Sequence, residues 1–155
     1  MNKKEIIHFD MDNTLIDFVS AIDELSDEIK REYEGRLDEV PGIFSLMKPM
    51  PGAIEAVKKL SQYFECHVAS TSPWENPSAW SDKLICIKTY FPKDFYKRLT
   101  LTHNKHNLRG EYLIDDRLAN GAGEFEGELI RFGSEEFPDW ESVTEYLINK
   151  YRSKN

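Results

Sequence analysis

Two aspartates, Asp10 and Asp12, follow an apolar run that ends at Phe9. The run predicts a buried strand over 4–9, and residues two apart on an extended chain point to the same side, about 6.5 Å apart. Carboxylates at the end of a buried strand are costly to desolvate unless a cation or a reaction uses them. We therefore interpret the pair as chemically active: one carboxylate can attack an electrophile while the other moves protons or reaches a metal ion.

Three further loops carry polar groups where a predicted strand ends. The hydroxyl-rich segment 70–72 follows the second strand, Lys105 follows the third, and Asp115 and Asp116 end the fourth. Each signal is weak alone, because a hydroxyl run is often a turn or helix cap and a loop lysine is usually solvated. The carboxyl ends of parallel strands share one edge of a sheet, so we expect the four loops to converge. Together with Asp10, the second acid pair forms an oxygen-rich site that suits Mg²⁺.

Alternating strands and helices are predicted to position these loops. Short apolar runs indicate five strands, at 4–9, 67–70, 99–101, 112–114 and 129–132. Apolar residues at helical spacing indicate four helices, with inward stripes at Phe18, Ile22, Leu25 and Ile29; Ile54, Val57 and Leu60; Trp80, Leu84, Ile87 and Phe91; and Trp140, Val143, Leu147 and Tyr151. This alternation favours a doubly wound α/β fold, with three α/β/α layers around a central parallel sheet of about five strands.

The chain is predicted to form a single domain over residues 1–155, because it shows neither an internal repeat nor a linker between domains. The segment 17–50 is an insertion directly after the first strand. We expect it to form a small helical cap over the carboxyl end of that strand. Gly35 is expected to break the helix within it, and the next helix is expected to begin at Pro51 or Gly52.

Composition restricts the classes of partner. The 155 residues carry a net charge of −8 and are 40% hydrophobic, as expected of an ordinary soluble protein. No stripe of lysine and arginine offsets the charge, which argues against a polymeric nucleic acid, whereas a bound cation would still allow a small anionic substrate. No apolar run approaches the ~20 residues that span a membrane, and no signal-peptide core precedes the first strand. We therefore expect a cytoplasmic protein that does not bind a membrane.

The cysteines and histidines provide no second site. Cys66 and Cys86 are expected to be reduced, buried thiols, because two cysteines at this spacing form neither a disulfide framework nor a metal pair. His103 and His106 flank Lys105, but without a third nearby ligand they are poor candidates for a zinc site. The acid pairs are therefore the best candidates for metal ligands.

The order of these motifs resembles that of the haloacid dehalogenase (HAD) superfamily of phosphohydrolases. The four HAD motifs map onto residues 10–14, Thr71, Lys105 and the pair Asp115 and Asp116. More narrowly, the chain resembles the 5'(3')-deoxyribonucleotidase branch of that superfamily. The stretches that carry this narrower resemblance are 49–57, 70–73 and 113–117. The resemblance spans nearly the whole chain, apart from the cap.

The resemblance implies a mechanism. Asp10 would be the nucleophile that takes the phosphoryl group as an aspartyl-phosphate. Asp12 would protonate the leaving alcohol and then deprotonate the water that hydrolyses the intermediate. Mg²⁺ would be held by the Asp10 carboxylate, the backbone carbonyl of Asp12 and Asp116, with Asp115 in its shell.

The same resemblance implies a set of substrate ligands. The expected phosphate ligands are the side chains of Thr71, Ser72 and Lys105 and the backbone N–H groups of Asn13 and Thr14. Asn13 replaces the glycine that is commonest at its position, but asparagine tolerates a positive φ. Phe18 is placed to face the substrate, although the short cap offers no recognisable aromatic pair to sandwich a base.

The leading hypothesis is a Mg²⁺-dependent phosphomonoesterase that acts on deoxyribonucleoside 5'(3')-monophosphates, as a monomer or a homodimer. One alternative is a HAD phosphatase of another small phosphorylated metabolite, since a short cap would select less strictly. Another is a catalytically silent phosphate-binding protein on the same fold. A phosphoryl-receiving signalling module is disfavoured, because its acid pair precedes its acceptor aspartate, whereas Asp10 lies at the end of the first strand.

Overall fold

A parallel five-stranded sheet forms the centre of the protein. The computed structural model describes residues 3–155, and its strand order is β5-β4-β1-β6-β7. The strands are β1 (Ile6–Phe9), β4 (Glu65–Ser70), β5 (Leu99–Leu101), β6 (Tyr112–Asp115) and β7 (Glu128–Arg131). All four pairings are parallel, and the last residue of β1 is aligned with Val68 on one side and Ile114 on the other. The predicted α/β fold with a central parallel sheet is confirmed.

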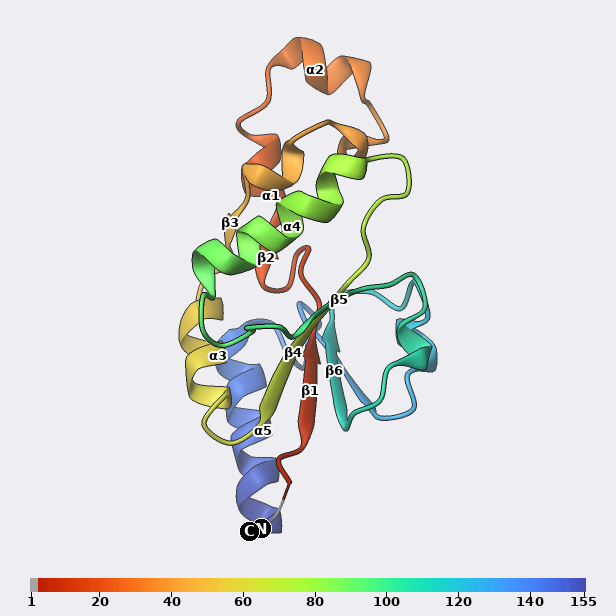
Figure 1. Ribbon diagram of the computed structural model, residues 1–155. Coiled ribbons are helices and arrows are strands. Elements are labelled where there is room, and N and C mark those ends of the chain that lie inside the picture. The colour runs from red at the N-terminus through yellow and green to blue at the C-terminus, as the bar shows by residue number, and fades with distance from the viewer. Residues whose placement is uncertain (1–2) are drawn as a thin grey trace.

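Three helices of eight or more residues lie outside this sheet, two of them beside it and the third beyond the carboxyl ends of its strands (Figure 1). They are α3 (Ala53–Leu60), α4 (Pro77–Tyr90) and α5 (Trp140–Lys154). Helices α3 and α5 lie side by side on one face, whereas the short turns η3 (Lys105–Asn107) and η4 (Ala122–Glu124) contact each other and lie near the other face (Figure 1). Within residues 3–155, no helix is long and apolar enough to cross a membrane.

Residues 16–49 form a separate group of short elements beyond the carboxyl ends of the strands (Figure 1). A two-residue ladder joins β2 (Ile16–Asp17) to β3 (Lys48–Pro49) at the base of this group. Between them are α1 (Phe18–Ile22), α2 (Asp27–Glu32), η1 (Leu37–Glu39) and η2 (Ile43–Ser45). Helix α4 packs against η2. The β2–β3 ladder therefore fixes both ends of this segment, and α4 supports it from one side.

The helix predicted from Phe18 to Ile29 is wrong as a single element. It ends at Ile22, and a second helix begins after Ser26. The physical reason is capping: the Ser26 hydroxyl accepts a hydrogen bond from the Ile29 N–H and so starts a new helix. The apolar spacing across 18–29 is compatible with either arrangement.

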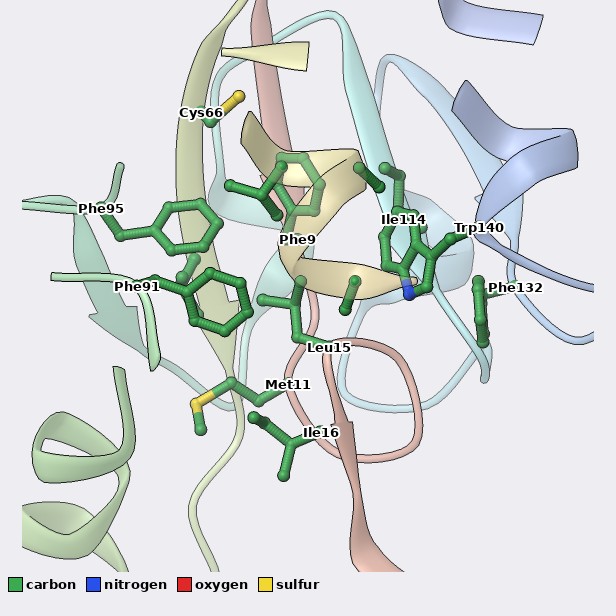
Figure 2. Packing of buried hydrophobic residues seen from close by; sticks show 14 of the residues in the cluster. Phe9, Met11, Leu15, Ile16, Cys66, Phe91, Phe95, Ile114, Phe132 and Trp140 are labelled. Atoms are coloured by element: carbon green, nitrogen blue, oxygen red, sulfur yellow. The ribbon is translucent and has the colours of Figure 1, made fainter. Parts of the chain in front are cut away.

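The loop that follows β1 packs on the main hydrophobic core. Phe9, Met11 and Leu15 are completely buried, and Figure 2 shows them in one cluster with Trp140. The Trp140 indole stacks on Phe9 and donates a hydrogen bond of 2.9 Å to the Thr14 carbonyl. Because Met11 points into the core, the aspartates on either side of it are directed away from the core. Packing therefore fixes the loop on which the candidate nucleophile lies.

Both cysteines are free and buried, as the sequence predicts. Cys66 lies on β4 in the core (Figure 2), and Cys86 lies on the inner side of α4. Burial raises the pKa of each thiol to about 12. A thiol with such a pKa carries almost no thiolate near neutral pH and is a poor nucleophile.

Candidate active site

The two acid pairs meet where β1 and β6 end side by side. Asp10, Asp115 and Asp116 each offer a carboxylate oxygen, and these oxygens lie within 4.8 Å of one another. The Asp10 N–H donates to the Ile114 carbonyl at 2.9 Å, which joins the two strand ends. Burial raises the pKa of Asp115 to about 6 and of Asp116 to about 8, and the nearby Asp10 carboxylate adds to both shifts. Three carboxylates this close require positive charge.

Lys105, in the loop that follows β5, supplies one positive charge. Its Nζ donates to Asp10 Oδ1 at 2.9 Å and to Asp115 Oδ2 at 2.5 Å. Burial alone would lower the pKa of Lys105, but the carboxylates of Asp10 and Asp115 outweigh it and the pKa is raised. The ammonium is therefore charged, and the predicted convergence of Lys105 with both acid pairs is present in the structure.

The remaining carboxylate oxygens fit a divalent cation. Both oxygens of Asp115 are occupied, one by Lys105 and the other by the Arg117 N–H at 3.0 Å. Asp116 Oδ1, by contrast, is buried without a hydrogen-bond partner. Hard oxygen donors of this kind suit Mg²⁺ better than zinc or copper. Asp116 could therefore hold the ion directly. The two oxygens of Asp10 accept from Lys105 and from the Thr14 hydroxyl, so Asp10, like Asp115, would use a remaining lone pair to reach the ion.

Asp12 lies apart from this acid group and has a lysine of its own. Asp12 Oδ2 accepts a hydrogen bond of 3.0 Å from Lys83 Nζ. Burial raises the pKa of Asp12, and the positive charge of Lys83 only partly offsets the shift. Lys83 was not predicted as a site residue, although its helical spacing with the apolar residues Ala79, Cys86 and Ile87, which are buried on the same side of α4, offered a signal.

The loop between the two aspartates and β2 is a tight turn. Asn13 has a φ of 60°, the conformation that its asparagine was expected to tolerate. Its N–H donates to the Ile16 carbonyl, and the Thr14 N–H donates to the Met11 carbonyl. These groups are therefore engaged within the turn, which differs from the expected role as free phosphate donors. The Thr14 hydroxyl instead donates to Asp10 Oδ2 at 3.1 Å and orients that carboxylate.

The hydroxyl groups after β4 differ in their availability. Thr71 Oγ1 donates to the Thr102 carbonyl at 2.7 Å, which connects this loop to the loop after β5. Ser72 Oγ is buried without a hydrogen-bond partner. The Ser72 hydroxyl is therefore the freer donor of the two expected phosphate ligands.

A cavity of about 570 Å³ opens beside these groups. Of the expected site residues, it is lined by Asp12, Asn13, Phe18, Thr71 and Ser72. Residues from the loops after β1, β4, β5 and β6 meet in this cavity, together with residues of the 17–50 segment. A volume of this size is within the range of roughly 300–1,000 Å³ that is typical of small-molecule sites.

Three aromatic residues outside the expected set also line the cavity: Phe44, Trp74 and His103. Phe44, from η2, packs against Phe18 with ring centroids 5.8 Å apart. Trp74 follows the hydroxyl loop, is 76% exposed, and lies 6.0 Å from the ring of His103. Phe44 carried no sequence signal, because nothing in a short 3₁₀ turn indicates which residue turns toward a distant loop. His103 belongs to this aromatic wall.

Comparisons with known proteins identify relatives of this chain. Residues 36–138, more than half of the chain, match the family described as 5' nucleotidase, deoxy (pyrimidine), cytosolic type C protein. A relative from Vibrio phage KVP40, provisionally named a 5'(3')-deoxyribonucleotidase, is 55% identical over 95% of this chain and 86% of its own length. The human 5'(3')-deoxyribonucleotidase, cytosolic type, is 29% identical over 77% of this chain and 53% of its own length.

The fold is shared with solved HAD structures. A magnesium-bound crystal structure of the HAD-hydrolase YfnB from Bacillus subtilis superposes with a TM-score of 0.58 at 15% identity, covering 94% of this chain and 99% of that one. Such low identity shows the fold alone. The family match and the similarity to the phage relative, in contrast, show the family. The chain therefore belongs to the 5' nucleotidase, deoxy (pyrimidine), cytosolic type C family of phosphoric monoester hydrolases.

Proposed function

We propose that the chain is a Mg²⁺-dependent phosphomonoesterase that hydrolyses deoxyribonucleoside 5'(3')-monophosphates through an aspartyl-phosphate on Asp10. The observation that supports this most is the separate pairing of two neighbouring carboxylates: Asp10 with Lys105, and Asp12 with Lys83. A nucleophile and a proton donor need different environments, and these lysines provide them. The proposed substrate class rests on the family description and on the names of the relatives.

In the first step, a carboxylate oxygen of Asp10 attacks phosphorus while the bond from phosphorus to the nucleoside oxygen breaks. Thr14 holds Asp10 for this attack by its hydrogen bond to Oδ2. Asp12 gives its proton to the departing oxygen, which leaves as an alcohol. Because burial raises the pKa of Asp12, its carboxyl group can hold that proton until it is needed.

In the second step, water attacks the phosphorus of the aspartyl-phosphate and the bond to Asp10 breaks. Asp12, now a carboxylate, takes the proton of that water. Inorganic phosphate leaves, and Asp10 is regenerated as a carboxylate. The nucleoside oxygen and the water occupy the same position relative to phosphorus, so one carboxyl group serves both steps.

Positive charge must offset the repulsion between an anionic phosphate and the Asp10 carboxylate. Lys105 supplies part of it beside Asp10. Asp10, Asp116 and the backbone carbonyl of Asp12 would hold Mg²⁺, which would supply the remaining positive charge. The hydroxyl groups of Thr71 and Ser72 would donate to the phosphate oxygens, where charge is spread in the transition state.

We further propose that residues 17–50 act as a cap that selects the substrate within a single domain. Phe18 and Phe44 come from this segment and line the cavity, with Trp74 from the loop after β4. Aromatic rings of this kind stack on a nucleobase, and stacking contributes about 1–3 kcal/mol per base. The cavity thus places an apolar, aromatic wall beside the carboxylates and hydroxyls that would hold the phosphate.

We also propose a cytoplasmic location. Both cysteines are free and buried, although an oxidising compartment would favour disulfides. The human relative is named as the cytosolic type. A small phosphorylated metabolite is available in that compartment, and the net charge of −8 disfavours a polymeric nucleic acid as an alternative partner.

The proposed function is tested by steady-state hydrolysis of a panel of phosphate esters. The panel contains deoxyribonucleoside 5'- and 3'-monophosphates, ribonucleotides, sugar phosphates and p-nitrophenyl phosphate, each with Mg²⁺ and with EDTA. We expect deoxyribonucleotides to give the highest kcat/KM, and EDTA to lower kcat by about 10³-fold or more. Turnover of sugar phosphates alone would contradict the substrate class, and full activity in EDTA would contradict the metal dependence.

Trp74→Ala is expected to raise KM for a deoxyribonucleotide by about 10-fold and to change kcat little, because a lost stacking contact weakens ground-state and transition-state binding alike. Its kinetics with p-nitrophenyl phosphate should change by less than about 2-fold, since that substrate carries no base. Trp74 is 76% exposed, so the variant should fold normally.

Tyr96→Ala is the matched control, because Tyr96 is an aromatic residue that is 69% exposed and does not line the cavity. Both variants are compared by Michaelis–Menten kinetics on the two substrates. An equal rise in KM for the nucleotide and for p-nitrophenyl phosphate would show that Trp74 does not contact the base.

A further inference from the structure

Lys83 is a fully buried cation on a helix that otherwise packs apolar groups. It lies on α4, and its side chain is 0% exposed. Lysine is almost never fully buried unless its charge is paired, because desolvating an ammonium group is costly. The fold therefore retains Lys83 at this position against a substantial energetic penalty. A buried salt bridge by itself is weak evidence for stability, so the groups that Lys83 contacts indicate its role better than its burial does.

All three N–H donors of this ammonium are occupied. Lys83 Nζ donates to Asp12 Oδ2 at 3.0 Å, to Ser70 Oγ at 2.7 Å and to the Thr71 carbonyl at 2.7 Å. The ring of Phe44 lies 4.7 Å from the same nitrogen. An ammonium group has three donors and no acceptor, so none is left for a substrate phosphate. Lys83 must therefore act through the groups that it holds.

Lys83 contacts Thr71 through its backbone carbonyl, whereas it contacts Asp12 through the carboxyl group that takes part in the proposed proton transfer. One oxygen of Asp12 is fixed by Lys83, while the other, Oδ1, is buried without a hydrogen-bond partner. Asp12 also lines the cavity. Since Lys83 holds Oδ2, the carboxyl group cannot rotate freely, and its orientation at the cavity is fixed.

We propose that Lys83 is a positioning residue that fixes the orientation of the Asp12 carboxyl group toward the leaving alcohol. The inference rests on the proposed function, in which Asp12 is the general acid. Lys83 joins three separate parts of the chain for this purpose: the loop after β1, the end of β4 at Ser70, and α4.

Phe44 connects this arrangement to the 17–50 segment. Its ring is 2% exposed, covers the ammonium of Lys83 and contacts Phe18 in the cavity wall. A cation over an aromatic face is stabilised more strongly when water is excluded. The segment that we propose as the cap thus shields the lysine that positions the acid, so the wall of the cavity and the proton donor are parts of one packed unit.

The test compares leaving groups that need a proton with one that does not. A deoxyribonucleoside monophosphate releases an alkoxide, which requires protonation, whereas p-nitrophenyl phosphate releases a stable phenolate. The parameter is kcat/KM, since it covers phosphoryl transfer to Asp10 and not the later hydrolysis. For Lys83→Met we expect a fall of about 10²-fold with the nucleotide and of less than about 3-fold with p-nitrophenyl phosphate.

Two further variants define the result. Asp12→Asn should show the same preference for p-nitrophenyl phosphate, and the double variant Asp12→Asn with Lys83→Met should lose no more nucleotide activity than Asp12→Asn alone. Lys88→Met is the matched control, because Lys88 is an exposed lysine on the same helix, and it should leave both substrates unchanged. If Lys83→Met does not fold, Lys83→Gln, which keeps N–H donors without the charge, should show the same preference to a smaller degree.

The outcomes separate this inference from the proposed function. Equal losses on both substrates for Lys83→Met, or additive losses in the double variant, would overturn the positioning role while the wild-type activity stands. If the wild type hydrolyses neither substrate, the proposed function itself fails, and the inference fails with it.

Discussion

Asp10→Asn is expected to lower kcat for deoxyribonucleotide hydrolysis by about 10⁴-fold or more while leaving the fold intact. An amide oxygen is a poor nucleophile, and the aspartyl-phosphate cannot form on it. The substitution is nearly isosteric, and it removes one of three carboxylates whose oxygens lie within 4.8 Å of one another. Mutual repulsion among the acids should therefore decrease, so the variant should unfold at the same urea concentration as the wild type or at a higher one.

The intermediate gives a second, direct measurement. Acid quenching of the wild-type enzyme during turnover of a ³²P-labelled nucleotide should trap labelled protein, and hydroxylamine should release the label because an acyl phosphate is cleaved by it. Asp10→Asn should trap none. The control is Asp23→Asn, an exposed aspartate at the end of α1, which should retain wild-type kinetics and labelling. If Asp10→Asn retains more than about a tenth of the activity, another group is the nucleophile.

The sequence was sufficient to predict where the chemistry would gather. Asp10 lies 95 positions from Lys105 in the chain, and both meet Asp115 because parallel strands end at the same edge of the sheet. Local conformation was also predictable where one residue determines it. Asn13 adopts the positive φ that asparagine tolerates, and this allows the turn that carries the acids.

Contacts between segments without a regular period were not predictable. Lys83 reaches Asp12 across 71 positions of the chain, and only its place on the buried side of α4 distinguished it from a solvated lysine. Phe44 enters the cavity from a 3₁₀ turn, where neighbouring side chains point in directions that no periodicity describes. Ser26 divides a helix that apolar spacing alone would continue, because a cap is decided by one hydroxyl group.

Lys105→Met is expected to damage both activity and stability. Without the ammonium group, kcat should fall by about 10²- to 10³-fold, since a charge next to the nucleophile and the phosphate is lost. In EDTA the free energy of unfolding should fall by about 3–5 kcal/mol, the usual cost of removing one partner from a buried ion pair. The side chains of Lys105, Asp10 and Asp115 are all less than 10% exposed, at 4%, 8% and 3%, so water cannot replace the lost contacts.

The dependence of stability on Mg²⁺ distinguishes this electrostatic explanation from loss of packing. In urea unfolding, Mg²⁺ should raise the midpoint of Lys105→Met more than that of the wild type, because the variant has lost the lysine that balances Asp10 and Asp115. Burial and the neighbouring Asp10 raise the pKa of Asp116, so in EDTA a proton on this group would relieve part of the repulsion in the wild type and the variant alike. Lys93→Met, at an exposed lysine, should behave as the wild type in both media. Equal Mg²⁺ shifts for Lys105→Met and the wild type would mean that Lys105 supports the site by packing and not by its charge.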